Sequence, residues 1–281
     1  MKIFCINSLF GAEFFGVLLC ISTSSTHRRV LFDHLSVDST AELGYTGSNK
    51  KKGAVFSMAK RTKLSDRSLP DYCQGEEMMN MVTHIVGGGL GIIALLACLF
   101  KSIFRGDGYD LAGALIYGIS MICLYTMSSV YHGLKPGMGK KVLQVLDHCT
   151  IYFLIAGTYS IISLSALRQV SPILGWGIIL FQWGMSALAV TLTAIDLKKY
   201  NVFSMICYIG MGWCIAPFMR QAMQVLTMPG FWLLLSGGIA YTIGAVLYGI
   251  GSKKRWMHSV FHIFVVLGSL LQFLCIILYV L

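Results

Sequence analysis

The stretch LAGALIYGISMICLYTM, residues 111–127, contains no charged side chain and is followed directly by the polar sequence SSVYHGL, residues 128–134. An apolar segment of about 20 residues is long enough to cross the hydrocarbon core of a bilayer as an α-helix. This segment therefore predicts a membrane-spanning helix whose last turn carries His132. At that position a histidine is either an interfacial side chain or one ligand of a metal site.

The whole chain has the composition of a membrane protein. Of its 281 residues, 56% are apolar and only 12% are charged, and the mean hydropathy is +0.71. Soluble domains carry about 25% charged residues. The net charge of +10 comes mainly from short loops and the N-terminal region, as is typical of cytoplasmic loops. We therefore predict no nucleic-acid partner. The nine cysteines include no CxxC pair and indicate neither a disulfide framework nor a thiolate zinc site.

The first 77 residues differ from the remainder. They hold ten of the 22 basic residues and eight of the 12 acidic ones, and most of them lack a helical or strand pattern. Residues 1–77 are therefore predicted to be a disordered N-terminal extension. Residues 8–22 contain a signal-like apolar core, which Glu13 interrupts. The sequence MAKRTKLSDR, which starts at Met58, equally suits a true N-terminus.

Residues 78–281 are predicted to form an all-α integral membrane domain. Apolar stretches follow one another here, separated by short loops, and each is long enough for a membrane-spanning helix. Such spans must be helical because the backbone polar groups find no partner in lipid. The fold class is therefore a seven-transmembrane helix bundle. Its predicted spans are 81–100, 111–133, 146–166, 173–194, 202–219, 230–250 and 259–280.

The distribution of lysine and arginine predicts the orientation in the membrane. If the segment before the first span is cytoplasmic, the cytoplasmic loops hold eight basic residues and the opposite loops hold four. The positive-inside rule then predicts a cytoplasmic N-terminus and an external C-terminus. We expect a multi-pass protein of the plasma membrane.

Three of these spans bring polar side chains to one layer near the cytoplasmic face. His132 ends the second span, Asp147 begins the third, and His258 and His262 begin the seventh. His258 and His262 are four residues apart and share a helix face, as do Ser128 and His132. Three imidazoles with one open position form the usual catalytic zinc site, and a carboxylate within a membrane is functional by default. The residues alone leave two interpretations open, a metal site and a set of interfacial or packing side chains.

Two further histidines and a glycine run need separate interpretation. His148 projects about 100° away from Asp147 around a helix, which directs it away from the other histidines. His84, at the start of the first span, either packs beside the site or binds a lipid headgroup. The run GGGLG, residues 87–91, lies inside a span and predicts close packing of two helices.

Four motifs resemble the hemolysin III branch of the progestin and adiponectin receptor family. They recur in the family's order over residues 76–281. The motifs are GEEMMNMVTH (75–84), SSVYHGL (128–134), LDHCTIYFLIAGTYS (146–160) and HSVFH (258–262). Glu77 and Asn80 match the family's pattern, but the residues themselves indicate no role for either.

The resemblance implies a site and an activity. It implies a zinc ion held by His132, His258 and His262 with a water molecule as the fourth ligand, and catalytic acid–base or positioning roles for Asp147 and Ser128. The implied activity is zinc-dependent hydrolysis of a lipid amide, or another effect on membrane lipid homeostasis. A non-enzymatic receptor or membrane regulator with structural zinc, and a haemolytic or cytolytic protein, remain alternatives. Membrane lipids are the expected partners.

Overall fold

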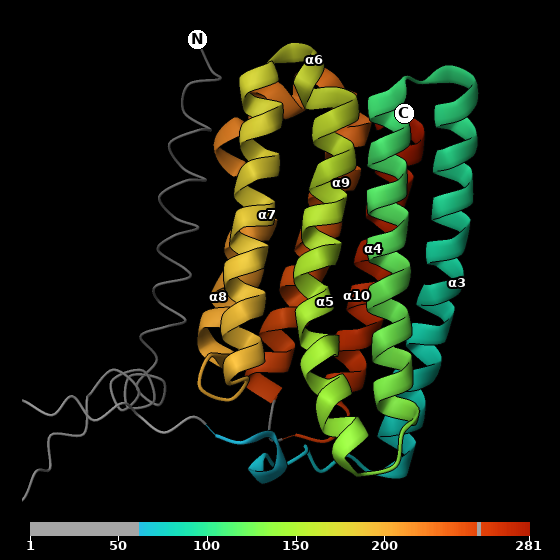
Figure 1. Cartoon of the computed structure of the whole chain (residues 1–281). Helices are drawn as coiled ribbons and strands as arrows, with labels where there is room; N and C mark the ends of the chain where they lie inside the picture. The colour runs from blue at the N-terminus through green and yellow to red at the C-terminus, as the bar shows by residue number, and fades with distance from the viewer. Residues whose placement is uncertain (1–61, 252–253) are drawn as a thin grey trace, which may run out of the picture. The chain divides into compact units, whose positions relative to one another are not determined.

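The computed structural model describes residues 62–251 and 254–281, and their regular structure is entirely helical (Figure 1). The all-α fold predicted from the sequence is therefore confirmed for these residues. Most of the predicted N-terminal extension, including the signal-like stretch 8–22 and Met58, lies outside the described residues.

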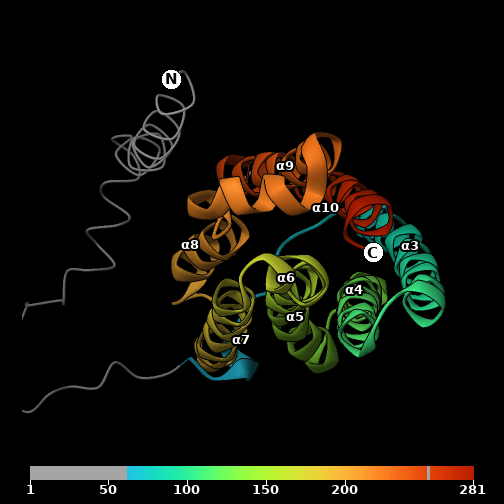
Figure 2. The same ribbon diagram turned by 90° about the horizontal axis from the view of Figure 1, so that it is seen from above.

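The long helices stand side by side in a ring, which Figure 2 shows from above. Successive helices pack on one another, and α10 packs on α3 to close the ring. The helices are α3 (Gln74–Arg105), α4 (Gly108–Gly133), α5 (Met138–Ile162), α7 (Pro172–Ile195), α8 (Asn201–Gly212), α9 (Met219–Gly251) and α10 (Met257–Cys275). Shorter elements complete the described structure: η1 (Leu64–Asp66), η2 (Ser163–Leu167), α6 (Arg168–Val170), η3 (Ala216–Phe218) and η4 (Ile276–Val280).

Six helical segments of the described residues are long and apolar enough to cross a membrane. Five of the seven predicted spans lie on segments of their own. The other two, 202–219 and 230–250, fall together in one segment of 49 residues, Asn201–Gly249. The helical membrane-protein class is thus supported, and the number of crossings depends on how this long segment is arranged.

The segment Asn201–Gly249 is not one straight helix. The α-helix is interrupted between α8 and α9, where Pro217 lies in the short element η3. Within α9, Thr227 has a φ of 58°, a conformation rarely adopted by β-branched residues, and Pro229 follows two residues later. A straight helix of 49 residues would be about 74 Å long, more than twice the hydrocarbon thickness of about 30 Å.

Small residues let α3 and α4 approach closely. Gly87 is buried against the ring of Tyr125, and a side chain at Gly91 would meet Ile122. A methyl group added at Gly89, on the outer face of α3, would have no neighbour within 4 Å. The close packing predicted from the glycine run is therefore confirmed for the buried glycines.

Helix α3 begins at Gln74, seven residues before the predicted span at 81. Its first turn is stabilised by Glu76, whose carboxylate accepts hydrogen bonds from the backbone N–H groups of Cys73 at 2.9 Å and Trp256 at 2.5 Å. The earlier start makes Glu77 part of the helix, at the same end of the bundle as the start of α10.

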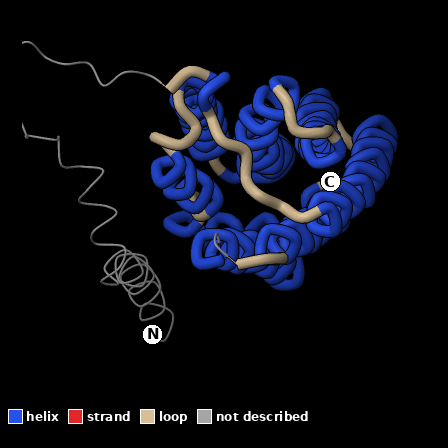
Figure 3. Tube along the Cα trace, turned by 90° about the horizontal axis from the view of Figure 1, so that it is seen from below, coloured by secondary structure: helices blue, strands red, loops and turns tan. Residues whose placement is uncertain are grey.

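Residues 62–73, which we call the strap, run across this end of the ring before entering α3 (Figures 1 and 3). Arg67 of the strap donates a hydrogen bond of 2.9 Å to the carbonyl oxygen of Ile195, at the end of α7. Further along, the ring of Tyr72 stacks on that of His258 with 4.9 Å between centroids. The strap thus covers the end of the bundle where the predicted site lies.

Candidate metal centre and its pocket

The three predicted metal ligands, on α4 and α10, bring their ring nitrogens together. Nε2 of His258 lies 3.4 Å from Nε2 of His132 and 3.0 Å from Nε2 of His262. One nitrogen from each of the three rings lies within 4.8 Å of the other two. His132 and His262 are buried and His258 is half-buried. The three histidines that the sequence predicts to converge therefore do so in the fold.

The donor set fits a divalent metal ion that prefers imidazole. Zinc–nitrogen bonds of about 2.0–2.1 Å in a tetrahedral site place the nitrogens roughly 3.3 Å apart, close to the two spacings between Nε2 atoms. Among the described residues, this group of three histidines is the one with metal-ligand spacing. The cluster could hold a metal ion with three protein nitrogens and leave one position open.

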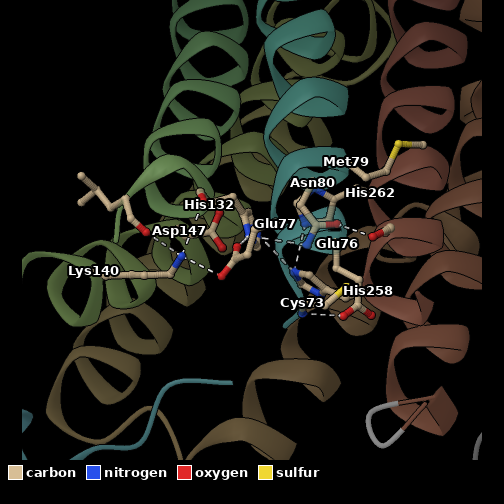
Figure 4. Close-up of polar contacts among 12 residues, drawn as sticks. Cys73, Glu76, Glu77, Met79, Asn80, His132, Lys140, Asp147, His258 and His262 are labelled. Atoms are coloured by element: carbon tan, nitrogen blue, oxygen red, sulfur yellow. Dashed lines mark hydrogen bonds and ion pairs between the residues drawn. The ribbon is translucent and has the colours of Figure 1, made fainter. Parts of the chain in front are cut away.

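A carboxylate lies behind His132, as Figure 4 shows. Oε2 of Glu77 is 2.6 Å from Nδ1 of His132, and Oε1 accepts a hydrogen bond of 2.7 Å from Nζ of Lys140. Lys140 is itself buried and donates to the carbonyl oxygen of Leu134 at 2.9 Å. A carboxylate on Nδ1 is the usual device that fixes the ring of a metal-binding histidine. It leaves Nε2 of His132 facing the other two histidines.

A second polar link joins α3 to α10 beside the cluster. Oγ of Ser259 donates a hydrogen bond of 2.6 Å to Oδ1 of Asn80, whose Nδ2 lies 3.5 Å from Nδ1 of His132. The sequence assigned no role to Asn80 or Glu77. Their spacing with His84 carried the signal, because positions 77, 80 and 84 share one face of a mainly apolar helix.

An apolar pocket extends from the histidines into the bundle. It contains about 1530 Å³ of space not filled by atoms, part of which is open to the surroundings, and its wall reaches from His258 and His262 to Gln272 and Phe231. Gln272 follows His258 by 14 residues on α10, which corresponds to about 21 Å along the helix. The pocket is therefore deep. Its histidines, Asp147 and Ser128 line one part of the wall, and Gln272 is a polar residue at the far end of an otherwise mainly apolar lining.

Asp147 and Ser128 line this same pocket, together with His258 and His262. Both residues are buried. Oγ of Ser128 has no hydrogen-bond partner among the described residues, and Oδ2 of Asp147 lies 3.9 Å from Nδ1 of His148. The fold thus brings both predicted catalytic residues to the pocket wall, while neither belongs to the histidine cluster itself.

The two remaining candidate histidines take different positions. His148 is outside the cluster, as expected, and its Nδ1 lies 2.8 Å from the carbonyl oxygen of Gln144. His84 packs beside the cluster, with its ring stacked on His262 at 3.8 Å between centroids. Neither ring nitrogen of His84 has a hydrogen-bond partner among residues 62–251 and 254–281. His84 also lines the apolar pocket.

The fold and the site together define a class of protein: a multi-pass helical membrane protein with a buried histidine cluster that could bind a metal ion at one end of an apolar pocket. Comparison with known proteins gives the particular family. The family model described as "Haemolysin-III related" matches residues 73–273. The chain belongs to this family, as the sequence motifs indicated.

Individual relatives agree with this assignment. The chain is 35% identical to Hemolysin-3 of Bacillus cereus over 206 residues. The aligned region covers 73% of this chain and 92% of the relative. It is 32% identical over 204 residues to the Hemolysin-3 homolog of Bacillus subtilis (strain 168), covering 73% and 94%. It is 25% identical over 214 residues to the human monocyte to macrophage differentiation factor, covering 72% and 83%. This last similarity supports membership of the progestin and adiponectin receptor superfamily. No solved structure matches the chain.

Proposed function

We propose that this protein is a zinc-dependent hydrolase of the plasma membrane that cleaves an amide bond in a lipid. One observation carries the proposal. Three imidazole nitrogens converge at one end of a deep, mainly apolar pocket, and Asp147 and Ser128 line the same pocket. Such an arrangement combines the parts needed for hydrolysis with a binding site for an apolar chain.

The roles of the residues follow from their chemistry. His132, His258 and His262 would hold the zinc ion. When bound, the ion supplies Lewis-acid chemistry and acidifies water. Asp147 accepts the proton of the attacking water and passes it to the leaving nitrogen. Ser128, whose Oγ is without a partner among the described residues, donates a hydrogen bond to the carbonyl oxygen as it gains charge.

The shape of the pocket supports a lipid substrate. Its depth of about 21 Å along α10 suits a long acyl chain, and its inner wall includes apolar side chains such as Phe231 and Leu234. An acyl chain bound there places its carbonyl group near the histidines. Because the pocket lies within a bundle whose outer surface is apolar, the substrate can enter from the membrane. Membrane lipids are therefore the proposed partners.

We also propose that the chain crosses the membrane seven times, with its N-terminus cytoplasmic and its C-terminus outside. In this arrangement α8 and the first residues of α9 form the fifth crossing, and the remainder of α9 forms the sixth. The non-helical conformation of Thr227 within α9 and the excess length of Asn201–Gly249 support two crossings in place of one.

A receptor or membrane regulator with a structural metal is the main alternative. Structural zinc sites usually have four protein ligands. The cluster formed by the described residues supplies three, which supports an open and reactive site. A haemolytic activity would follow the name of the bacterial relatives, and the geometry of the site offers no separate support for it.

Metal analysis combined with an activity assay tests the proposal. We expect about one zinc ion per chain in detergent-purified protein and none in the double variant His258→Ala/His262→Ala. Asp147→Asn is expected to keep its zinc but to hydrolyse a long-chain N-acyl amide at least roughly 100-fold more slowly. Wild-type protein that stays metal-free after zinc reconstitution would contradict the site. Zinc-loaded wild-type protein that hydrolyses no lipid amide would favour the structural-metal alternative.

A further inference from the structure

A second pocket lies beneath the strap and adjoins the first at His258. It contains about 980 Å³ of space not filled by atoms, part of which is open to solvent. His148, Asn201, Tyr248 and His258 belong to the walls of both pockets. A ligand could therefore extend from the apolar pocket, past His258, into the space under the strap.

The second pocket differs from the first in the character of its wall. The basic side chains of Arg67 and Lys198 line it, and polar side chains such as Gln144 and Asn201 contribute to it. Asp66 is its acidic lining residue and is exposed to solvent. The pocket thus has an excess of positive charge, and the two adjoining pockets together have the polarity of an amphiphile.

Arg67 gives this pocket its most specific feature. The side chain is buried, with only 8% of the residue exposed. Nη2 donates to the carbonyl oxygen of Ile195, but Nε and Nη1 have no hydrogen-bond partner among the described residues. A buried cation with unpaired N–H groups is costly unless an anion compensates it.

No carboxylate of the described residues forms an ion pair with Arg67 within 4 Å. Asp196 lies near enough to interact electrostatically. However, its carboxylate oxygens accept hydrogen bonds from the backbone N–H groups of Thr62 at 3.3 Å and Lys199 at 3.2 Å. Within the part of the chain that the structure describes, the charge of Arg67 is therefore available for a further anion.

We propose that the pocket under the strap binds the anionic head of an amphiphile whose acyl chain fills the apolar pocket. The position of the cleaved amide between the two, at the histidines, rests on the proposed hydrolase function. The ligand class is a long-chain N-acyl compound that carries a carboxylate or phosphate close to its amide. Arg67 binds this oxyanion directly, and Lys198 adds longer-range attraction.

A binding experiment in the presence of a metal chelator tests the head pocket without turnover. Wild-type protein in detergent is titrated with a long-chain N-acylglycine and with the corresponding neutral N-acylglycinamide. We expect the acid to bind roughly tenfold more tightly. Arg67→Gln removes this preference, and Arg67→Lys restores part of it. Lys199→Gln is the matched control, because Lys199 is exposed beside Lys198 but does not line the pocket, and it keeps the full preference.

Two further measurements separate the proposal from folding defects and from the binding of a free anion. Lys198→Gln changes an exposed side chain and is expected to reduce the preference by a few-fold, with an unchanged unfolding temperature. Inorganic phosphate should displace the N-acylglycine only weakly, because the acyl chain contributes most of the binding. Equal affinity of wild-type protein for acid and amide, or an unchanged preference in both Arg67→Gln and Lys198→Gln, would overturn the proposal. Strong displacement by phosphate would assign the pocket to a free anion instead.

The outcomes also separate this proposal from the hydrolase function. A charge preference that depends on Arg67, in a protein that hydrolyses no N-acyl amide, would leave the head pocket and reject the hydrolase. Hydrolysis by zinc-loaded protein without any charge preference would reject only the head pocket.

Discussion

At the scale of single residues, His132 is the most constrained member of the histidine cluster. Its Nδ1 contacts Glu77, which is in turn held by Lys140. By contrast, Nδ1 of His258 and Nδ1 of His262 have no hydrogen-bond partner among the described residues. Glu77 therefore fixes the orientation of one ligand, around which the two histidines of α10 are placed.

Replacing Glu77 is predicted to weaken metal binding. Glu77→Gln removes the negative charge behind His132 and leaves the buried charge of Lys140 uncompensated. Loss of such a supporting contact typically lowers metal affinity by roughly 10- to 100-fold. Competition with a chelator of known zinc affinity measures the change directly.

The double variant Glu77→Gln/Lys140→Met separates metal binding from folding. Removing both charges abolishes the unpaired buried cation, so we expect the unfolding temperature to recover towards the wild-type value. Zinc affinity should stay low because His132 still lacks its carboxylate. Recovery of zinc affinity together with stability would show that Glu77 acts only through the stability of the fold.

At the scale of helices, the contact between α3 and α4 supports the histidine cluster through aromatic rings. Gly87 lies against Tyr125, and the ring of Tyr125 packs edge-on against His84 at 5.0 Å between centroids. His84 then stacks on His262. The closeness of two helices is thus linked through these rings to a residue of the histidine cluster.

Alanine substitutions in the glycine run should have opposite effects. Gly87→Ala introduces a methyl group that overlaps the Tyr125 ring, and overpacking of this kind costs about 1–3 kcal/mol. Gly89→Ala meets no neighbour and gains helix propensity of up to about 1 kcal/mol. We expect a lower unfolding temperature for Gly87→Ala and an unchanged or higher one for Gly89→Ala. Equal effects would argue against the close contact of α3 with α4.

The strap is held at its start by Asp196, which makes its attachment dependent on pH. Burial would raise the pKa of this carboxyl group, but hydrogen bonds from the backbone N–H groups of Lys199 and Thr62 outweigh it and lower the pKa below its ordinary value of 3.8. A group whose pKa is lowered by folding stabilises the fold above its ordinary pKa. That contribution is lost as the pH falls through the lowered value.

We therefore expect the start of the strap to loosen in acid. Amide hydrogen exchange of residues 62–67, corrected for the intrinsic effect of pH, should be constant above about pH 5 and increase below about pH 3.8. Asp196→Asn should make the exchange faster at neutral pH and remove the pH dependence. Exchange in the wild type that is already unprotected at neutral pH would contradict the anchoring role of Asp196.

At the scale of the whole molecule, the arrangement of Asn201–Gly249 decides the topology. Two crossings by this segment place the loop before α8 and the loop before α10 on the same side of the membrane. One crossing would place them on opposite sides. Both loops are rich in lysine, as is the region from Lys135 to Lys141, which includes the start of α5. The positive-inside rule favours a common cytoplasmic side for all three.

Reporter fusions distinguish the two arrangements. An alkaline phosphatase domain, which is active only outside the cytoplasm, is joined after Lys199, after Lys254 or after Leu281. Seven crossings predict an inactive reporter at Lys199 and Lys254 and an active one at Leu281. A single crossing by Asn201–Gly249 predicts activity at Lys254 and none at Leu281, which would reject the seven-crossing proposal.

The sequence by itself determined the class of fold, the family and the three histidines that meet. Apolar runs and i, i+4 spacing are local properties, so the order of residues alone places His258 and His262 on one helix face. The depth of His132 followed from its place at the end of a span. These predictions succeeded because a membrane restricts the chain to helices of nearly equal length that cross the bilayer.

Only the tertiary structure decided what surrounds these histidines. Glu77 meets Lys140 across 63 positions of sequence, and Arg67 meets Ile195 across 128. The strap and the meeting of the two pockets at His258 depend on such contacts as well. Neither hydropathy nor helical spacing records which side chains of different helices come together. Those partners are selected by packing between distant segments and by the cost of leaving a buried charge or polar group unpaired.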